Sequence, residues 1–249
     1  NTILFLACTN YDFEPRGLYC FNHEEGKIEW YFPVAGNSNN FRITEDGILI
    51  GVGSPANGHE VRDEKDEDGF LYFVNHNGNL KWKKNLGFGM GSFIVEVWND
   101  TLLTYNSYHW GSKGSSSVSL MNLETKEYLK KVEFPGKTFV VEPAKMFEID
   151  GEMLFPFVTP DSRLVMVSRN LEIKRSFEVN SVGHLYVLDD FPEKGRITFA
   201  VRGLDLDLYL YDMEGNLLVK SPSVLFVEKF FDGENHNKLL IVGYKTSGV

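Results

Sequence analysis

A strand–turn–strand segment recurs along the chain, and this internal repeat restricts the fold more than any other sequence feature. Its five copies cover residues 17–30, 69–82, 118–129, 164–175 and 208–219. The spacings between copies are 53, 47, 46 and 44 residues when the copies are aligned on Asn22, Asn75, Asn122, Ser168 and Asp212. A period of this length indicates a repeat architecture, in which each copy forms one supersecondary unit.

Each copy is predicted to form an antiparallel hairpin, because two apolar strands flank a polar turn into which Asn, Asp or Ser hydrogen-bonds. The hairpins are expected near 17–32, 69–84, 117–132, 163–178 and 207–220. Between them lies a second strand pair with its own turn, at 41–52, 93–105, 145–157, 185–201 and 227–244. Each period therefore carries four short strands, and no segment has the sustained 3.6-residue apolar period of a helix.

Four antiparallel strands per repeat predict an all-β fold, a β-propeller with four-stranded blades that covers 1–249 as a single domain. Five and six blades both remain open, because the first repeat lacks its first strand and the last stops after its second. A β-sandwich is the main alternative. Asn1 stands where an initiator Met is expected, so the chain is either processed or excised from a longer protein.

The repeat resembles the pyrroloquinoline-quinone-type repeat of quinoprotein-like propellers. Two copies carry the resemblance best: Leu18-Tyr19 through Gly26-Lys27 to Trp30, and Leu71-Tyr72 through Gly78 to Trp82. The resemblance implies the fold, but the repeat is shared by dehydrogenases, outer-membrane assembly factors and binding proteins. A quinone would need a Trp platform, an Arg and a calcium ion, and no such set is identified, so no cofactor is predicted.

The charge balance bears on the partner. With 35 acidic residues against 25 basic ones the net charge is -10, and no basic stripe is present to bind nucleic acid. No apolar run approaches the ~20 residues that span a bilayer. The composition favours a protein or glycan partner, and localisation is left open with an extracytoplasmic site, secreted or in the cell envelope, favoured.

Propellers place function in loops at one mouth of the ring, here the connections between strand four and strand one and between strands two and three. The residues expected to contact a partner there are Tyr108, His109, Trp110, Asn39, Asn40, Met90, Glu142 and Lys145. The loop at 108–117 is the preferred contact, because exposed aromatic rings stack on sugars or anchor proteins. The alternative is that its rings fold back over the blade.

An enzymatic alternative is centred on His184, whose imidazole would act as nucleophile or base at the entrance of an inner strand. Residues 40–49 loosely resemble a blade start of bacterial arylsulfotransferases, which implies a transferase or hydrolase using His184 with Arg42 and Arg202. This chain has Asn where that pattern favours His. A multivalent lectin is the third alternative, and it would repeat one loop residue in every blade.

Two further candidates are structural or metal sites. The acidic loop at 63–69 has carboxylates at alternate positions before a Gly, as in a calcium loop, and its candidate ligands are Asp63, Asp66 and Asp68. An EF-hand spacing would need a carboxylate at the position of Asn75, so a solvated loop is expected. The six His are scattered, which argues against zinc. Cys8 and Cys20 fall on neighbouring strands and form either a disulfide or two buried thiols.

The sequence therefore predicts a β-propeller that serves as a rigid binding or interaction module without its own chemistry. Fold analogy alone supports this function and both alternatives, because fold does not determine function.

Overall fold

The computed structural model describes most of the chain, in two compact units with the bounds Asn1–Lys137 and Thr138–Val249. The described residues are 2–7, 16–56, 58, 60–108, 114–136, 139–140, 145–189, 191, 196–231 and 237–243. Each unit is described by itself. The expectation of one propeller domain over 1–249 remains a prediction.

The described residues form antiparallel strands and contain no helix, which confirms the all-β fold class. Accordingly, no helix in this part of the chain is long and apolar enough to cross a membrane.

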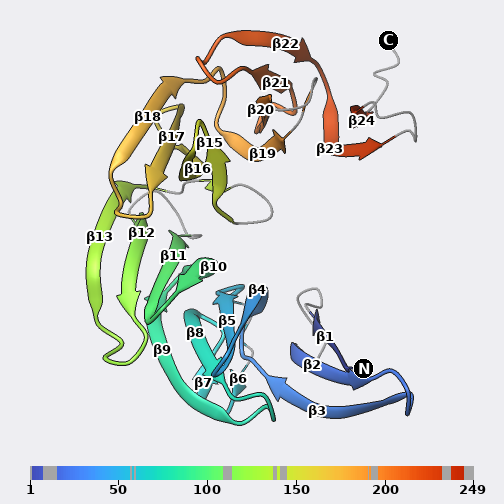
Figure 1. The fold of residues 1–249 in the computed structure, drawn as a ribbon, viewed down its shortest axis with the longest axis vertical. Helices are drawn as coiled ribbons and strands as arrows, with labels where there is room; N and C mark the ends of the chain where they lie inside the picture. Colours follow the sequence, from blue (N-terminus) through green and yellow to red (C-terminus); the bar gives the residue numbers. More distant parts are fainter. Residues whose placement is uncertain are drawn as a thin grey trace. The chain divides into compact units, whose positions relative to one another are not determined.

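The first unit contains three groups of strands (Figure 1). The first group, in the order β1-β2-β3, consists of β1 (Thr2–Ala7), β2 (Gly17–Asn22) and β3 (Lys27–Pro33). The second pairs in the order β4-β5-β8-β9 and consists of β4 (Asn37–Thr44), β5 (Gly47–Gly53), β8 (Asp68–Val74) and β9 (Leu80–Phe88). The third pairs in sequence order and consists of β10 (Met90–Trp98), β11 (Thr101–Tyr108), β12 (Ser115–Asn122) and β13 (Tyr128–Pro135).

Two details complete the first unit. A small hairpin of β6 (Glu60–Val61) and β7 (Glu64–Lys65) lies in the connection between β5 and β8. One residue pair between β5 and β10, Gly53 with Gly91, joins the second and third groups into an 8-stranded sheet.

The second unit repeats the same arrangement. One sheet consists of β14 (Phe139–Val140) and β15 (Phe147–Ile149), both paired with β16 (Glu152–Thr159), followed by β17 (Arg163–Ser168) and β18 (Ile173–Glu178). The next pairs in sequence order and consists of β19 (Gly183–Asp189), β20 (Ile197–Gly203), β21 (Leu208–Tyr211) and β22 (Leu217–Ser221). A last hairpin consists of β23 (Val224–Phe231) and β24 (Asn237–Gly243).

β5 is buried along its whole length because both of its faces are covered. Successive side chains of a strand point to opposite faces. Ile48 and Ile50 pack with Leu18 and Phe32 of the first strand group. Leu49, on the other face, belongs to a second apolar cluster with Ile94, Leu102 and Met121 of the third group. The core of the first unit therefore consists of strand groups packed face to face through β5 and β8.

In each turn that follows β2, β8, β12, β17 and β21, the predicted Asn, Ser or Asp side chain hydrogen-bonds to the main chain of the turn. Asn75 Oδ1 accepts hydrogen bonds from the main-chain N–H groups of Asn77 and Asn79, at 3.0 and 2.9 Å. The same type of bond is made by Asn22, Asn122, Ser168 and Asp212. The predicted turn chemistry is confirmed at all five copies.

Candidate functional site

The first unit contains an open cavity of about 690 Å³ between its second and third strand groups. Four segments form it: the β4–β5 turn, the start of β9, the β10–β11 turn and the β12–β13 turn. These lie at the opposite strand ends from the mouth that the sequence analysis favoured, since Asn39 and Met90 are near the beginnings of β4 and β10. None of the residues predicted to contact a partner belongs to these turns.

One wall of the cavity is the indole of Trp82, and its floor is apolar. Trp82 is half-buried and packs on Phe73, with ring centroids 5.6 Å apart. Val97 and Leu123 line the cavity and pack, like Trp82, against the apolar cluster that contains Leu49. The floor of the cavity is therefore continuous with the core.

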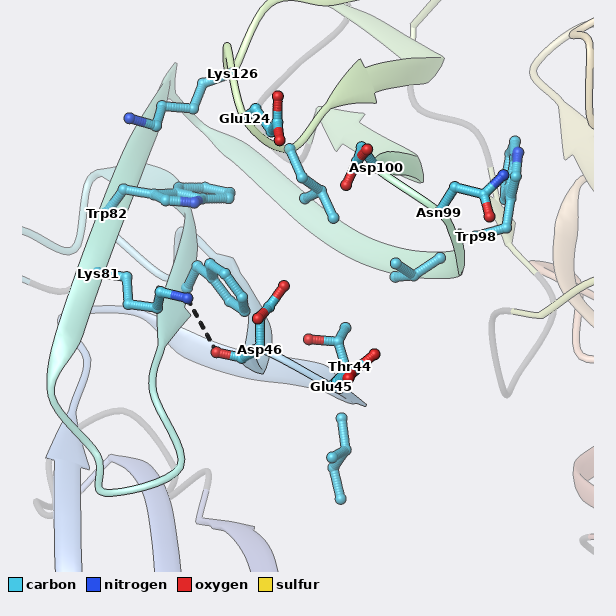
Figure 2. A pocket seen from close by; sticks show the side chains of 14 residues that line it. Thr44, Glu45, Asp46, Lys81, Trp82, Trp98, Asn99, Asp100, Glu124 and Lys126 are labelled. Carbon is cyan, nitrogen blue, oxygen red and sulfur yellow. Dashed lines mark hydrogen bonds between the residues drawn. The ribbon is translucent and has the colours of Figure 1, made fainter.

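Carboxylates surround the remaining sides. Figure 2 shows Asp46, Asp100 and Glu124 around the hollow into which the Trp82 ring extends, and Glu45 also lines it. Within the described chain, none of these four carboxylates forms an ion pair with a basic side chain. The cavity therefore combines an aromatic face with negative charge that the surrounding protein does not neutralise.

Two lysines also line the cavity, without pairing with these carboxylates. Lys81 Nζ donates to the main-chain oxygen of Asp46 at 3.0 Å and lies 4.7 Å from the centroid of the Phe73 ring. Lys126 extends from the β12–β13 turn (Figure 2), and its main-chain oxygen accepts a hydrogen bond from Lys84 Nζ at 2.8 Å.

Trp82 and its counterpart Trp30 are both half-buried, but different turns lie opposite them. Trp30 occupies the matching position in β3, and Gly78 of the β8–β9 turn lies so close to it that an added Cβ would be 2.6 Å from its ring. Gly215 lies equally close to Phe177 of the preceding sheet. In the β12–β13 turn, the residue with positive φ that corresponds to Gly78 and Gly215 is Lys126, with φ of 63°.

The β12–β13 turn is also one residue longer. Asn75 N–H bonds to the oxygen of Asn79, whereas Asn122 N–H bonds to the oxygen of Glu127. The main chain of this longer turn still meets β9 at Lys84, but the turn places no glycine against the Trp82 ring, and the cavity lies beside that ring.

The second unit contains a smaller cavity of about 410 Å³, also between successive sheets. Asp150, Arg196, Asp212 and Glu214 are among the residues that line it. Asp150 forms an ion pair with Arg175 of β18. Burial disfavours the charge on Asp212, but hydrogen bonds within its turn outweigh burial and lower the pKa of its carboxyl group.

Two of the predicted partner-binding residues hold strands together. Asn39 Nδ2 donates to the main-chain oxygen of Ser92 at 2.9 Å. Asn40 Nδ2 donates to the oxygen of Ile94, and Asn40 Oδ1 accepts from the N–H of the same residue. These amides connect β4 to β10, which gives them a structural role.

The other predicted contact residues are only partly described. Met90 lies directly opposite Tyr108 on β10 and β11, and the half-buried Tyr108 ring lies against Gly114. Lys145 is exposed, with Nζ 4.8 Å from the centroid of the Phe147 ring. His109, Trp110 and Glu142 lie outside the described residues, so their predicted role remains a prediction.

Two residues of the enzymatic alternative are neighbours. His184 lies directly opposite Arg202 in the pairing of β19 with β20. Arg42 belongs to the first unit, where its Nη1 donates to the main-chain oxygen of Phe41 and burial lowers the pKa of its guanidinium group. The three predicted catalytic residues are thus divided between the two units.

The three aspartates of the calcium candidate have separate surroundings. Asp66 is fully buried and pairs with the buried Arg16, with Oδ2 3.6 Å from Nη1. Asp68 Oδ2 accepts from Asn85 Nδ2 at 2.7 Å, and Asp63 is exposed. No group of three or more His, Cys, Asp or Glu residues placed to hold a metal ion is found among the described residues.

The Cys20 thiol is free and buried. Burial, together with the nearby Glu29 carboxylate 3.5 Å away, raises the pKa of this thiol to about 11. Leu4 is its neighbour across β1. Cys8 lies outside the described residues, so the predicted disulfide stays a prediction.

No protein-family model matches the chain, and no curated protein matches it. Among solved structures, it is similar to a protein of unknown function from Bacteroides caccae, with a TM-score of 0.51, 14% identity, and coverage of 98% of this chain and 83% of that chain. It is also similar to the Dos1 propeller, with a TM-score of 0.53, 12% identity, and coverage of 83% of this chain and 53% of that chain. The chain thus spans about half the length of the Dos1 structure. The all-β antiparallel sheets and this likeness together support a β-propeller fold.

Proposed function

We propose that the chain is a β-propeller interaction module that binds a protein partner and carries out no chemistry of its own. The finer architecture we propose is that of quinoprotein-like propellers, with four-stranded blades, five or six in number. Two strand groups of the first unit and the β19–β22 sheet support it, because each has four antiparallel strands that pair in sequence order. In such a fold the sheets form a scaffold and the turns carry the recognition.

The observation that carries the proposed function is the half-buried Trp82 that lines an open cavity. Aromatic residues in pockets supply much of the binding energy of protein interfaces. The surrounding turns are formed by their own hydrogen bonds, so the site is present before a partner arrives and little entropy is lost on binding. We therefore place the partner-binding surface at the β4–β5, β10–β11 and β12–β13 turns.

The test is site-specific photo-crosslinking in the organism that makes the protein. A photoreactive benzoylphenylalanine replaces Thr125, in the exposed β12–β13 turn, and in a control protein it replaces Asp161, in the exposed β16–β17 turn. We expect a discrete protein adduct at position 125, reduced by at least about tenfold in a Trp82→Ala background. Two results would contradict the proposed function: no adduct at position 125 in the otherwise unchanged protein, or an adduct of equal yield in the Trp82→Ala background.

A further inference from the structure

We propose that the cavity beside Trp82 takes a positively charged side chain, lysine or arginine, from a basic segment of the partner. This inference rests on the proposed function and adds the chemistry of the partner. It comes from three features of the cavity: its charge, its aromatic wall and its apolar floor. A fourth observation, in the second unit, points to the same ligand class.

The charge of the lining favours a cation. Four carboxylates and two ammonium groups line the cavity, and no basic side chain of the described chain pairs with those carboxylates. Lys81 is bonded to a main-chain oxygen instead. A lysine or arginine entering the hollow would form charge-assisted hydrogen bonds with Asp46, Asp100 or Glu124. The net charge of -10 adds long-range attraction for a basic segment.

The aromatic wall gives the same preference. Tryptophan has the best aromatic face for a cation, and the attraction grows when the site is partly shielded from water. Trp82 is half-buried, and its ring extends into the hollow that the carboxylates surround (Figure 2). The matching Trp30 is also half-buried, but Gly78 lies against its ring, whereas no described glycine lies against the Trp82 ring.

The floor fits the rest of such a side chain. Phe73, Val97 and Leu123 present apolar surface at the bottom of the cavity. Lysine and arginine bury their methylene stems along apolar surface while the charged group finds polar partners. A cavity with an apolar floor and carboxylates around it matches both parts of one side chain.

The second unit already contains a cation at the matching place. Trp82 lies opposite Phe73, two residues before the turn residue Asn75, and Arg175 lies opposite Met166, two residues before Ser168. The guanidinium group of Arg175 pairs with Asp150 of the nearby β15–β16 turn. Where the first unit has an indole and unpaired carboxylates, the second unit supplies the positive charge from its own chain.

The test is a titration of the whole protein with tetralysine, followed by the indole N–H resonance of Trp82 in NMR spectra. The Trp82→Phe variant assigns that resonance. Fully acetylated tetralysine is the uncharged control probe. We expect a saturable shift with tetralysine, none with the acetylated peptide, and affinity at least about tenfold lower in the Asp100→Asn/Glu124→Gln variant. Glu127→Gln is the matched control, because Glu127 belongs to the same turn and does not line the cavity, and its affinity should stay within about twofold of the unchanged protein.

Three outcomes would overturn the inference: no shift with tetralysine, an equal shift with the acetylated peptide, or equal losses in the Glu127→Gln and Asp100→Asn/Glu124→Gln variants. An equal shift with maltotetraose would assign the cavity to a carbohydrate instead. If tetralysine fails while the Trp82-dependent adduct forms at position 125, the interaction module stands and only the chemistry of its partner is wrong. If tetralysine binds and no adduct forms, the cation site stands and the proposed function fails.

Discussion

Two cavities, one in each unit, occupy similar places in the repeat and differ in how their carboxylates are paired. In the first unit, Trp82 faces carboxylates that no basic side chain of the described residues neutralises. In the second, Arg175 stands at the position of Trp82 and pairs with Asp150. The two units thus differ at a shared strand position, where the first has an aromatic ring that lines its cavity and the second has a cation paired with a residue that lines its cavity.

The comparison extends to the turns that cover each ring. A glycine with positive φ allows the β8–β9 and β21–β22 turns to lie against rings of the preceding sheets, Trp30 and Phe177. Lys126 holds this place in the β12–β13 turn. The scaffold is shared, and the proposed recognition site lies where the turn is longer and has Lys126 in place of the glycine.

The largest expected effect comes from removing a covering glycine. Gly78→Ala adds a Cβ that would lie 2.6 Å from the Trp30 ring at a residue with φ of 77°. We expect the free energy of unfolding to fall by about 2–4 kcal/mol, because backbone strain and overpacking add. Urea denaturation measures it. Gly26→Ala is the matched control, since Gly26 has φ of 64° and nothing within 4 Å of the added Cβ. It should cost only about 1–2 kcal/mol, and equal losses would show that the ring contact is unimportant.

The next effect is on binding. Trp82→Arg gives β9 the residue type that β18 has at the matching position, so the carboxylates of the first cavity gain an internal partner and its aromatic wall is lost. We expect tetralysine affinity to fall by more than about tenfold, or ~1.4 kcal/mol, with little change in stability because the site is half-exposed. Isothermal titration calorimetry measures the affinity. Unchanged affinity would break the proposed link between the two cavities.

The reverse exchange should have a smaller effect. Arg175→Trp removes the partner of Asp150 and adds an aromatic face beside the second cavity. We expect weak binding of tetralysine at a second site, with affinity about tenfold below that of the first, because Arg196 also lines this cavity. Equilibrium dialysis reports the stoichiometry. A value that stays at one would mean that the second cavity lacks the geometry of the first.

The smallest effect concerns the turn residue, which is Asn75 in the first unit and Asp212 in the second. Hydrogen bonds lower the pKa of Asp212 in the folded state despite burial, so its charged form stabilises the fold above the unfolded pKa, and this contribution is lost as pH falls through the folded pKa. Asp212→Asn should therefore lower the unfolding free energy by about 0.5 kcal/mol or less at pH 7, since the turn is solvent-accessible. The difference should vanish at pH values below the folded pKa. Urea denaturation at several pH values measures it, and a difference that grows in acid would contradict this account.

The local chemistry of the fold could be predicted because it is contained in short segments. Strands follow from apolar runs between turn residues, and the five turns are held by the Asn, Ser or Asp that the sequence marks. The all-β class follows from these repeated signals. The relative placement of successive sheets depends on contacts between residues far apart in sequence, such as Asn40 with Ile94.

The candidate site could not be predicted from the same signals. Asn39 and Asn40 were predicted to bind a partner because they lie at the predicted mouth. Their side-chain amides instead connect β4 to β10. The cavity beside Trp82 depends on one additional residue in a turn and on Lys126 in place of glycine, and both are small changes against the repeat. A comparison of the copies could have located the cavity. Trp30 and Trp82 hold matching positions, and the turn of the next copy contains a glycine after Trp30 but not after Trp82.

The side chain that holds each turn has an evolutionary consequence. The side chain of Asn75, or of its counterpart in another copy, accepts hydrogen bonds from the main-chain N–H groups of its own turn. The side chains of the other turn residues are therefore not needed to form the turn. These residues can be substituted, including by charged residues, and the turn can gain an insertion, while the strands on either side stay paired. Duplicated copies can in this way diverge into surfaces of different specificity on an unchanged frame, much as antibody loops diversify on theirs.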